Sequence, residues 1–253
     1  MAGVGNNDKC GVGAAVNSVG IASLRVFGPY PRNSVYSLES ALRKNMDSIS
    51  VYLNSWELSR SGTTLGKMPN SVMAAIQFGT EEGRNGLGSM YVIGSGSGGE
   101  NGDSCNYDSV TNSPYTFTVG SLGKSGKIAT YSERCDAVLV AAPGGDSEGG
   151  LVSADLVGAE GLSEGDCVDS SDGFFGPSAA AAYTSSVIAH ILKAVPLLTW
   201  RDVQHVLVKS SSVVDVAQGG WGRNGANFNY SSAYGMHDNP GLLQYLSDSC
   251  LEL

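Results

Sequence analysis

The chain has 253 residues, of which 42% are hydrophobic and 15% charged, a balance typical of a globular fold rather than of a disordered segment. Its net charge of −9 argues against a nucleic-acid backbone as partner, because that partner needs a basic face. No stretch is long and apolar enough to span a membrane, and the first residues lack the apolar core of a signal peptide. A chain of this length can bury one sizeable core, so we expect one domain over residues 1–253.

Strand-like and helix-like patterns alternate along the chain. Strands are expected at 21–26, 48–53, 90–93, 115–119 and 137–142, and helices at 37–45, 70–80, 178–194 and 200–210. Residues 144–174 are rich in Gly, Ser, Asp and Glu, which predicts surface loop with one short hairpin. The tail from residue 211 is expected to be mostly coil. This alternation is typical of an α/β fold with a mostly parallel sheet.

A serine stands where a loop gives way to a helix. Pro177 has a backbone angle suited to a first helical turn, and four alanines and an apolar helical repeat follow Ser178. The N–H groups and dipole of a first turn favour negative charge, which suits a nucleophile whose attack creates an oxyanion. On this pattern alone, an ordinary helix cap is the commoner explanation. Because sites form at the carboxyl ends of parallel strands, Ser55, Ser97 and Ser178 are expected on one rim.

The surroundings of this serine resemble a known family. Residues 176–179, the small-residue helix after them and the run LTWRDVQH at 198–205 resemble the nucleophile helix of subtilisin-like serine peptidases, in the kexin/furin branch. Further matches follow in the same chain order, at 6–13, 86–99, 103–106 and 131–135. The resemblance covers nearly the whole chain. It implies a subtilisin-like three-layer α/β fold with a mostly parallel central sheet, from which the N-terminal part is missing.

The resemblance also implies roles for single residues. Ser178 takes the position of the nucleophile, and Ser97 takes the position of the oxyanion-binding asparagine. The substrate-binding positions are Ser55, Trp56, Glu57 and Gly96. In an intact longer form, the implied reaction is acyl transfer from a polypeptide to Ser178, followed by hydrolysis.

A serine nucleophile also needs a general base within hydrogen-bond reach and a carboxylate that orients the base. The family's Asp and His motifs precede the segment that residues 1–13 resemble, so we expect the chain to lack both. His190 lies more than two helical turns from the nucleophile. His205 falls where a structural role is expected, and His237 matches no family position. The resemblance thus implies a partial peptidase domain, without the family's downstream accessory domain.

Three further positions depart from the family pattern. A serine hydroxyl at Ser97 is shorter than an asparagine amide, and losing one oxyanion donor typically lowers the rate by about 10²–10³-fold. Glu57 puts a bulky side chain where the family has a glycine beside the substrate backbone. Pro177 replaces a threonine and removes one backbone N–H.

These departures predict a serine endopeptidase family member that is inactive as this chain. One alternative is a catalytically dead pseudo-peptidase that binds peptides or regulates another protein. A second alternative is a fragment of an active peptidase whose Asp and His motifs lie upstream. A fragment would explain the missing motifs, but it would not explain the departures within the chain. In each case the expected partner is a polypeptide, with no nucleic acid and no membrane segment, and the oligomeric state stays open.

Calcium is the one cofactor that the resemblance implies. Of the family's acidic positions beneath the specificity pocket, Asp103 and Glu133 are present, and the third is Arg60. Calcium requires several carboxylate oxygens, so this exchange weakens the site. We expect Arg60 to replace the ion and to pair with Asp103 or Glu133, with a solvent-facing Arg60 as the alternative.

Five cysteines are consistent with an oxidising compartment. The resemblance implies disulfides between Cys10 and Cys167 and between Cys105 and Cys135, and it leaves Cys250 unpaired. Five reduced thiols are the alternative. A secretory or extracellular location would follow if a longer form carries a signal peptide, and the sequence itself leaves the compartment open.

Overall fold

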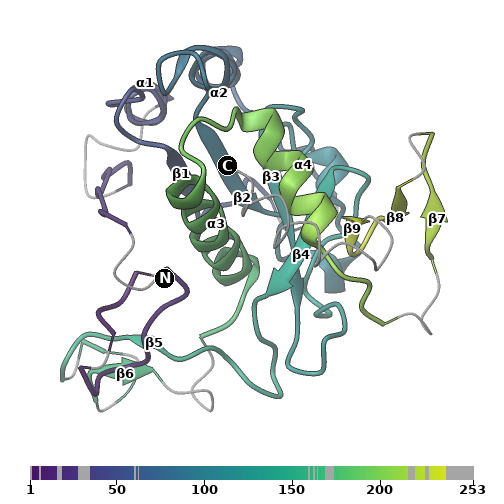
Figure 1. Cartoon of the computed structure of the whole chain (residues 1–253). Coiled ribbons are helices and arrows are strands. Elements are labelled where there is room, and N and C mark those ends of the chain that lie inside the picture. The colour runs from purple at the N-terminus through teal and green to yellow at the C-terminus, as the bar shows by residue number, and fades with distance from the viewer. Residues whose placement is uncertain are drawn as a thin grey trace.

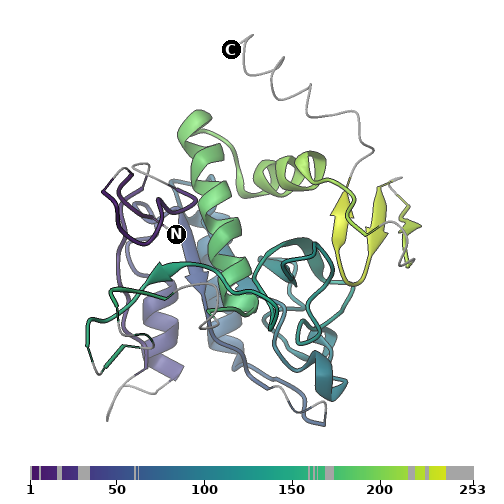
Figure 2. The ribbon, with the colours of Figure 1, turned by 90° about the horizontal axis from the view of Figure 1, so that it is seen from below.

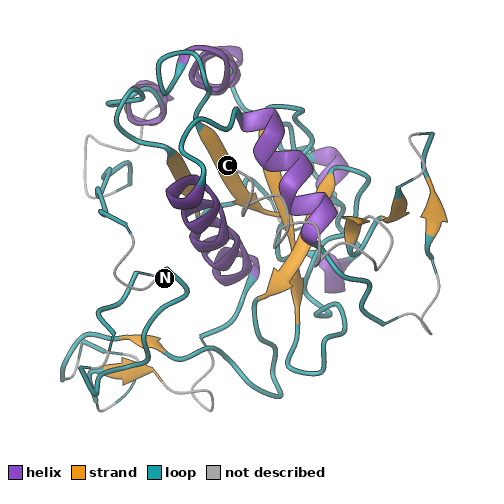
Figure 3. Ribbon diagram, in the orientation of Figure 1, coloured by secondary structure: helices purple, strands orange, loops and turns teal. Residues whose placement is uncertain are grey.

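The structure is a computed structural model. It describes residues 2–5, 7–15, 19–27, 35–59, 61, 63–158, 160–161, 163, 165–168, 174–215, 220–225 and 228–237. The described residues form an α/β fold in which helices cover both faces of a central sheet (Figures 1 and 3). No helix in these ranges is both long enough and apolar enough to cross a bilayer.

The central sheet has seven strands in the order β1-β2-β3-β4-β9-β8-β7. The four parallel strands are β1 (Val51–Asn54), β2 (Met90–Gly94), β3 (Thr116–Leu122) and β4 (Val138–Pro143). The antiparallel strands are β9 (Gly235–His237), β8 (Asn229–Ser231) and β7 (Gly222–Arg223). A separate hairpin pairs β5 (Ser153–Ala154) with β6 (Cys167–Val168).

Within the described ranges, four α-helices complete the three layers. They are α1 (Val35–Leu42), α2 (Asn70–Glu82), α3 (Pro177–Ala194) and α4 (Trp200–Ser210). Two short 3₁₀ turns, η1 (Gly99–Asn101) and η2 (Cys105–Tyr107), lie between β2 and β3. Figure 2 shows α3 and α4 on the opposite side of the sheet from α1 and α2.

Strand β2 explains why both faces need covering. Successive side chains of a strand point to opposite faces. Met90 and Val92 pack in the core beneath α3 and α4, whereas Tyr91 and Ile93 pack in the core beneath α1 and α2. All of these side chains are buried, as expected for a parallel strand enclosed on both faces.

The expected elements are found with one exception. Residues 21–26 form no strand: Ile21 is 71% exposed, whereas Leu24 and Val26 are half-buried and pack from a loop against the core beneath α1 and α2. The described part of the tail is mostly coil, as predicted, but the short strands β7, β8 and β9 extend the sheet there. These strands have only two or three residues, too few to give a readable alternation of apolar and polar side chains. The hairpin expected within 144–174 is formed by β5 and β6.

Both expected disulfides are present. Cys10–Cys167 joins the N-terminal segment to β6 across a sequence separation of 157, and the neighbouring Lys9–Asp166 ion pair at 2.6 Å lies at the same junction. Cys105–Cys135 is buried between η2 and the segment before β4. Cys250 lies outside the described residues. Closing long loops lowers the entropy of the unfolded chain, so both bridges favour the fold.

The LTWRDVQH run has a structural role. The Thr199 hydroxyl accepts from the Asp202 N–H, and the Asp202 carboxylate accepts from the Thr199 N–H, which forms a capping box at the start of α4. The backbone N–H of Trp200 donates to the Leu87 carbonyl, and the buried Val203 faces the core. The motif therefore fixes the turn between α3 and α4 and the docking of α4.

The first turn of α3 lies directly on the end of β2. A Cβ atom placed on Gly94 would lie 2.7 Å from the backbone of Pro177, closer than real Cβ contacts allow. Three of the four alanines after Ser178 are buried (Ala179, Ala180 and Ala181), and their small size permits the same close approach. Because Gly94 has no side chain, Ser178 can lie close to the edge of the sheet.

We expect Gly94→Ala to destabilise the protein by about 1–3 kcal/mol, because the added methyl must displace backbone rather than a flexible side chain. Unfolding in urea measures the change. Gly222→Ala is the matched control, since its Cβ meets nothing within 4 Å, and its midpoint should stay close to that of the wild type. Equal midpoints for both variants would contradict the packing described for Gly94.

Candidate active site

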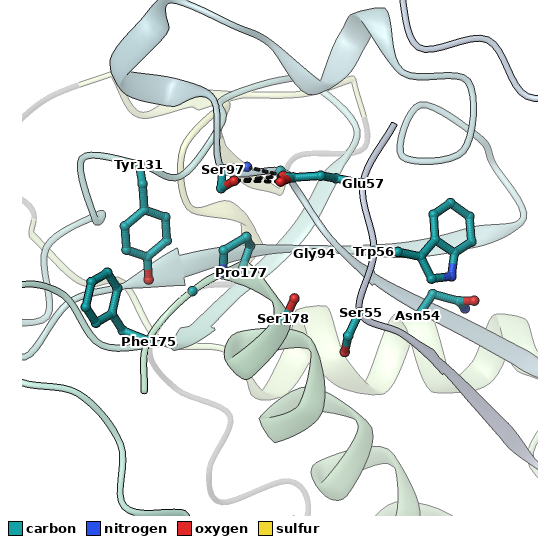
Figure 4. A pocket seen from close by; sticks show the side chains of 12 residues that line it. Asn54, Ser55, Trp56, Glu57, Gly94, Ser97, Tyr131, Phe175, Pro177 and Ser178 are labelled. Carbon is teal, nitrogen blue, oxygen red and sulfur yellow. Dashed lines mark hydrogen bonds between the residues drawn. The ribbon is translucent and has the colours of Figure 1, made fainter. Parts of the chain in front are cut away.

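A cleft opens where β1 and β2 end and α3 begins (Figure 4). Its cavity volume is about 510 Å³. It is lined by Asn54, Ser55, Trp56, Glu57, Gly94, Gly96, Ser97, Tyr131, Phe175, Gly176, Pro177 and Ser178. The structure thus brings together every residue that the sequence placed in the nucleophile, oxyanion and substrate-binding positions. These come from three segments that are far apart in the chain.

Ser178 is the second residue of α3 and is half-buried at the cleft. The helix begins at Pro177, and Gly176 before it has a φ of 146°, a conformation that favours glycine. The Gly176 N–H donates to the Gly144 carbonyl at 2.9 Å, which anchors the turn. N–H groups in a first helical turn have no acceptor within the helix, so this position suits a developing negative charge.

Glu57 reaches across the cleft to the oxyanion position. Its carboxylate accepts from the Ser97 backbone N–H at 2.8 Å and from the Ser97 hydroxyl at 2.8 and 2.9 Å. A hydroxyl has a single proton, so Ser97 shares that proton between the two carboxylate oxygens. Figure 4 shows these bonds between the two loops. In this arrangement the Ser97 side chain has no proton left to donate to an oxyanion formed at Ser178.

Glu133 lies beneath the same loop and is 3% exposed. Its carboxylate accepts from the Gly98 N–H at 3.0 Å. A Cβ on Gly96 would lie 2.4 Å from this carboxylate, which explains the glycine there, and the φ of 108° at Gly96 also favours glycine. Burial is the main cause that raises the pKa of Glu133 to about 7.

Three further carboxylates add to the raised pKa of Glu133, and they belong to Asp103, Glu57 and Asp108. Asp108 was not among the predicted site residues. Its carboxylate accepts from the N–H groups of Val110 and Thr111, and burial raises its pKa. Because aspartate is common in turns, the sequence offered no signal that would have selected it.

The acidic residues fit a calcium site only in part. Among the described residues, Asp103 and Glu133 belong to no group of three acidic, thiol or imidazole ligands whose atoms lie within 4.8 Å of one another. Calcium takes six to eight oxygen ligands. These side chains therefore do not by themselves make up a cation site. The expected pairing of Arg60 with Asp103 or Glu133 lies outside the described residues, and calcium binding stays a prediction.

Two aromatic rings form another wall of the cleft. Tyr131 and Phe175 are stacked, with ring centroids 5.8 Å apart. The Tyr131 hydroxyl is held by the Ser121 hydroxyl at 2.6 Å and by the Gly145 carbonyl at 2.7 Å, and burial raises its pKa. Phe175 is 43% exposed. Sequence reasoning did not place either residue in the site, because the fold alone brings the segment after β3 beside the loop before α3.

No described histidine side chain lines the cleft. His190 lies on α3, and its Nε2 atom is 2.7 Å from the Ala14 carbonyl oxygen, so it contacts the N-terminal segment instead. His205 is exposed on α4, in agreement with its expected place outside the site. The side chain of His237 is outside the described part of the chain. Within the described residues, the cleft therefore contains a serine but no imidazole base.

The raised pKa of Glu133 predicts a pH dependence of stability. The unfolded carboxyl ionises near its ordinary pKa of 4.5, whereas the folded carboxyl keeps its proton up to about pH 7. Between these values the folded state binds more protons, so this group makes the free energy of unfolding fall by about 3 kcal/mol as the pH rises. Urea unfolding in EDTA should show Glu133→Gln gaining stability over the wild type from pH 5 to pH 8.

Glu82→Gln is the control, because Glu82 is exposed on α2 and the variant has the same change in charge. It should keep the pH dependence of the wild type. A Glu133→Gln variant whose stability relative to the wild type stays constant or falls from pH 5 to pH 8 would contradict the prediction, since a falling value requires a favourable partner for the charged carboxylate.

Comparisons with known proteins agree with this geometry. Residues 1–236 match the Subtilase family. The chain is 35% identical over 239 residues to PC3-like endoprotease variant B of Hydra vulgaris, which covers 92% of the chain and 32% of the relative. It is also 35% identical over 236 residues to proprotein convertase subtilisin/kexin type 7 of Homo sapiens, covering 93% and 29%. The chain thus spans about a third of the length of these relatives.

Solved structures show the same fold. The crystal structure of a serine protease of Aeromonas sobria superposes with a TM-score of 0.71 at 18% identity, covering 83% of this chain and 45% of that one. A cold-adapted subtilisin-like serine proteinase superposes with a TM-score of 0.51 at 18% identity, covering 77% and 62%. Since the family match extends over most of the residues, the chain belongs to the subtilase family.

Proposed function

We propose that the chain is a serine-endopeptidase-type domain whose cleft binds polypeptide without hydrolysing it. The observation that carries this proposal is the hydrogen bonding of Ser97 to the Glu57 carboxylate beside Ser178. Hydrolysis by a serine needs a proton acceptor and donors aimed at the oxyanion. Here the hydroxyl at the oxyanion position donates to a carboxylate, and a carboxylate repels the charge that forms during attack.

The cleft keeps features that suit an extended peptide. It lies at the carboxyl ends of the parallel strands β1 and β2, where Ser55, Trp56 and Gly96 are among the lining residues. An apolar wall of Tyr131 and Phe175 lies near the nucleophile position and offers a surface for a side chain. These features support binding of a polypeptide and do not depend on catalysis.

Hydrolysis by Ser178 is the second candidate function, and one observation favours it. Ser178 lies at the N-terminus of a buried helix, next to the oxyanion position and inside the cleft. A form of the protein that brings a histidine and an aspartate to the cleft would supply the base that the described residues do not. The relatives at 35% identity carry endoprotease and convertase names, which supports this candidate.

A fluorophosphonate probe separates the two candidates. We expect the 253-residue protein to show no labelling above that of Ser178→Ala, because an unactivated serine hydroxyl reacts slowly. Fluorescein-labelled casein should release no fragments in the same samples. Stoichiometric labelling that disappears in Ser178→Ala would overturn the proposal and favour the peptidase.

A further inference from the structure

Glu57 and Ser97 meet because two loops leave the same edge of the sheet. Strands β1 and β2 are parallel neighbours, and their register sets Asn54 beside Ile93. Glu57 lies three residues beyond β1, and Ser97 lies three residues beyond β2. The gap between these loops is part of the cleft that contains Ser178. A contact between the loops therefore crosses the space that a peptide along this edge must enter.

The Glu57 carboxylate is held by Ser97 in the way that a bound ligand would be. A backbone N–H and a hydroxyl both donate to one carboxylate, with distances of 2.8 to 2.9 Å. Charge-assisted hydrogen bonds of this kind are stronger than neutral ones. A peptide carbonyl offers the same type of acceptor without the charge. The Glu57 side chain thus occupies donors that would otherwise face an incoming peptide.

We propose that Glu57 is an internal latch, which closes the cleft by occupying the Ser97 donors and which a peptide must displace in order to bind. This inference rests on the proposed peptide-binding function of the same cleft. The competition is intramolecular, so the carboxylate is always present beside its donors, whereas a peptide must arrive from solution. The apparent dissociation constant for peptide is then the intrinsic constant divided by the fraction of molecules in which the latch is open.

The latch makes a prediction that involves no ligand. In the wild type the Ser97 N–H is protected from hydrogen exchange by its bond to Glu57. Glu57→Ala removes the acceptor, and the exchange of the Ser97 amide, followed by NMR, should become about ten- to hundredfold faster. The Val92 amide in β2 serves as the internal reference for global stability. Glu82→Ala, an exposed glutamate on α2, should leave the exchange of both amides unchanged.

Peptide binding supplies the second measurement, with the uncharged probe acetyl-tetra-alanine amide. A neutral probe is chosen so that the changed charge at residue 57 does not act on it over a distance. Titration is followed by the fluorescence of Trp56, which lines the cleft, and Trp56→Phe identifies that signal. We expect the dissociation constant to fall at least about tenfold in Glu57→Ala and to stay at the wild-type value in Glu82→Ala.

The outcomes separate the latch from the proposed function. Unchanged Ser97 exchange in Glu57→Ala overturns the latch, whatever the peptide does. Faster exchange with equal peptide affinity in both proteins also overturns it, since the contact then does not compete with ligand. Faster exchange with no peptide binding to either protein supports the contact but overturns the peptide-binding function. Glu57→Gln, which keeps the size of the side chain but not its charge, should give intermediate exchange.

Discussion

The parallel pairing of β1 with β2 is the constraint on which the cleft depends. Its register ends both strands at one edge of the sheet, so the loops that carry Glu57 and Ser97 leave side by side. Gly94 has no side chain, and this lets the first turn of α3 pack on that edge and bring Ser178 to the same place. A change in strand register or a methyl group at Gly94 would separate the three segments, even with every cleft residue intact.

Fold and chemistry are specified by different residues in this chain. The LTWRDVQH run caps and docks α4, and the buried alanines of α3 allow close packing on the sheet. None of these groups belongs to the cleft. The residues that identify the chain as a subtilase therefore determine its fold, whereas activity depends on a few side chains at the edge of the sheet. A protein can keep the first set and change the second, because a fold does not by itself fix the chemistry of its site.

Much of the fold could be predicted from the sequence, because in long segments such as Asn70–Glu82 the spacing of apolar residues predicts a helix. The nucleophile, oxyanion and substrate-binding positions of the cleft could also be predicted, since the motif around Ser178 and the loop at Ser97 are local patterns. The wall of Tyr131 and Phe175 was not predicted, because its rings meet only through the tertiary fold. The hydrogen bonds of Glu57 were missed for the same reason, as a side chain at a strand end can point into the cleft or into solvent.

Ser97 and Glu57 look like two separate departures from the family pattern in the sequence, but in the structure they form one interaction. A serine hydroxyl can rotate its proton towards an acceptor on either side, which an asparagine amide held in one plane cannot do as freely. Glu57 supplies that acceptor, and Ser97 in turn supplies two donors to a carboxylate that lies near other acidic groups. Each residue thus stabilises the other, but not equally: a glycine at residue 57 would remove the acceptor of both Ser97 donors, whereas an asparagine at residue 97 would remove the hydroxyl and keep the backbone N–H that donates to Glu57.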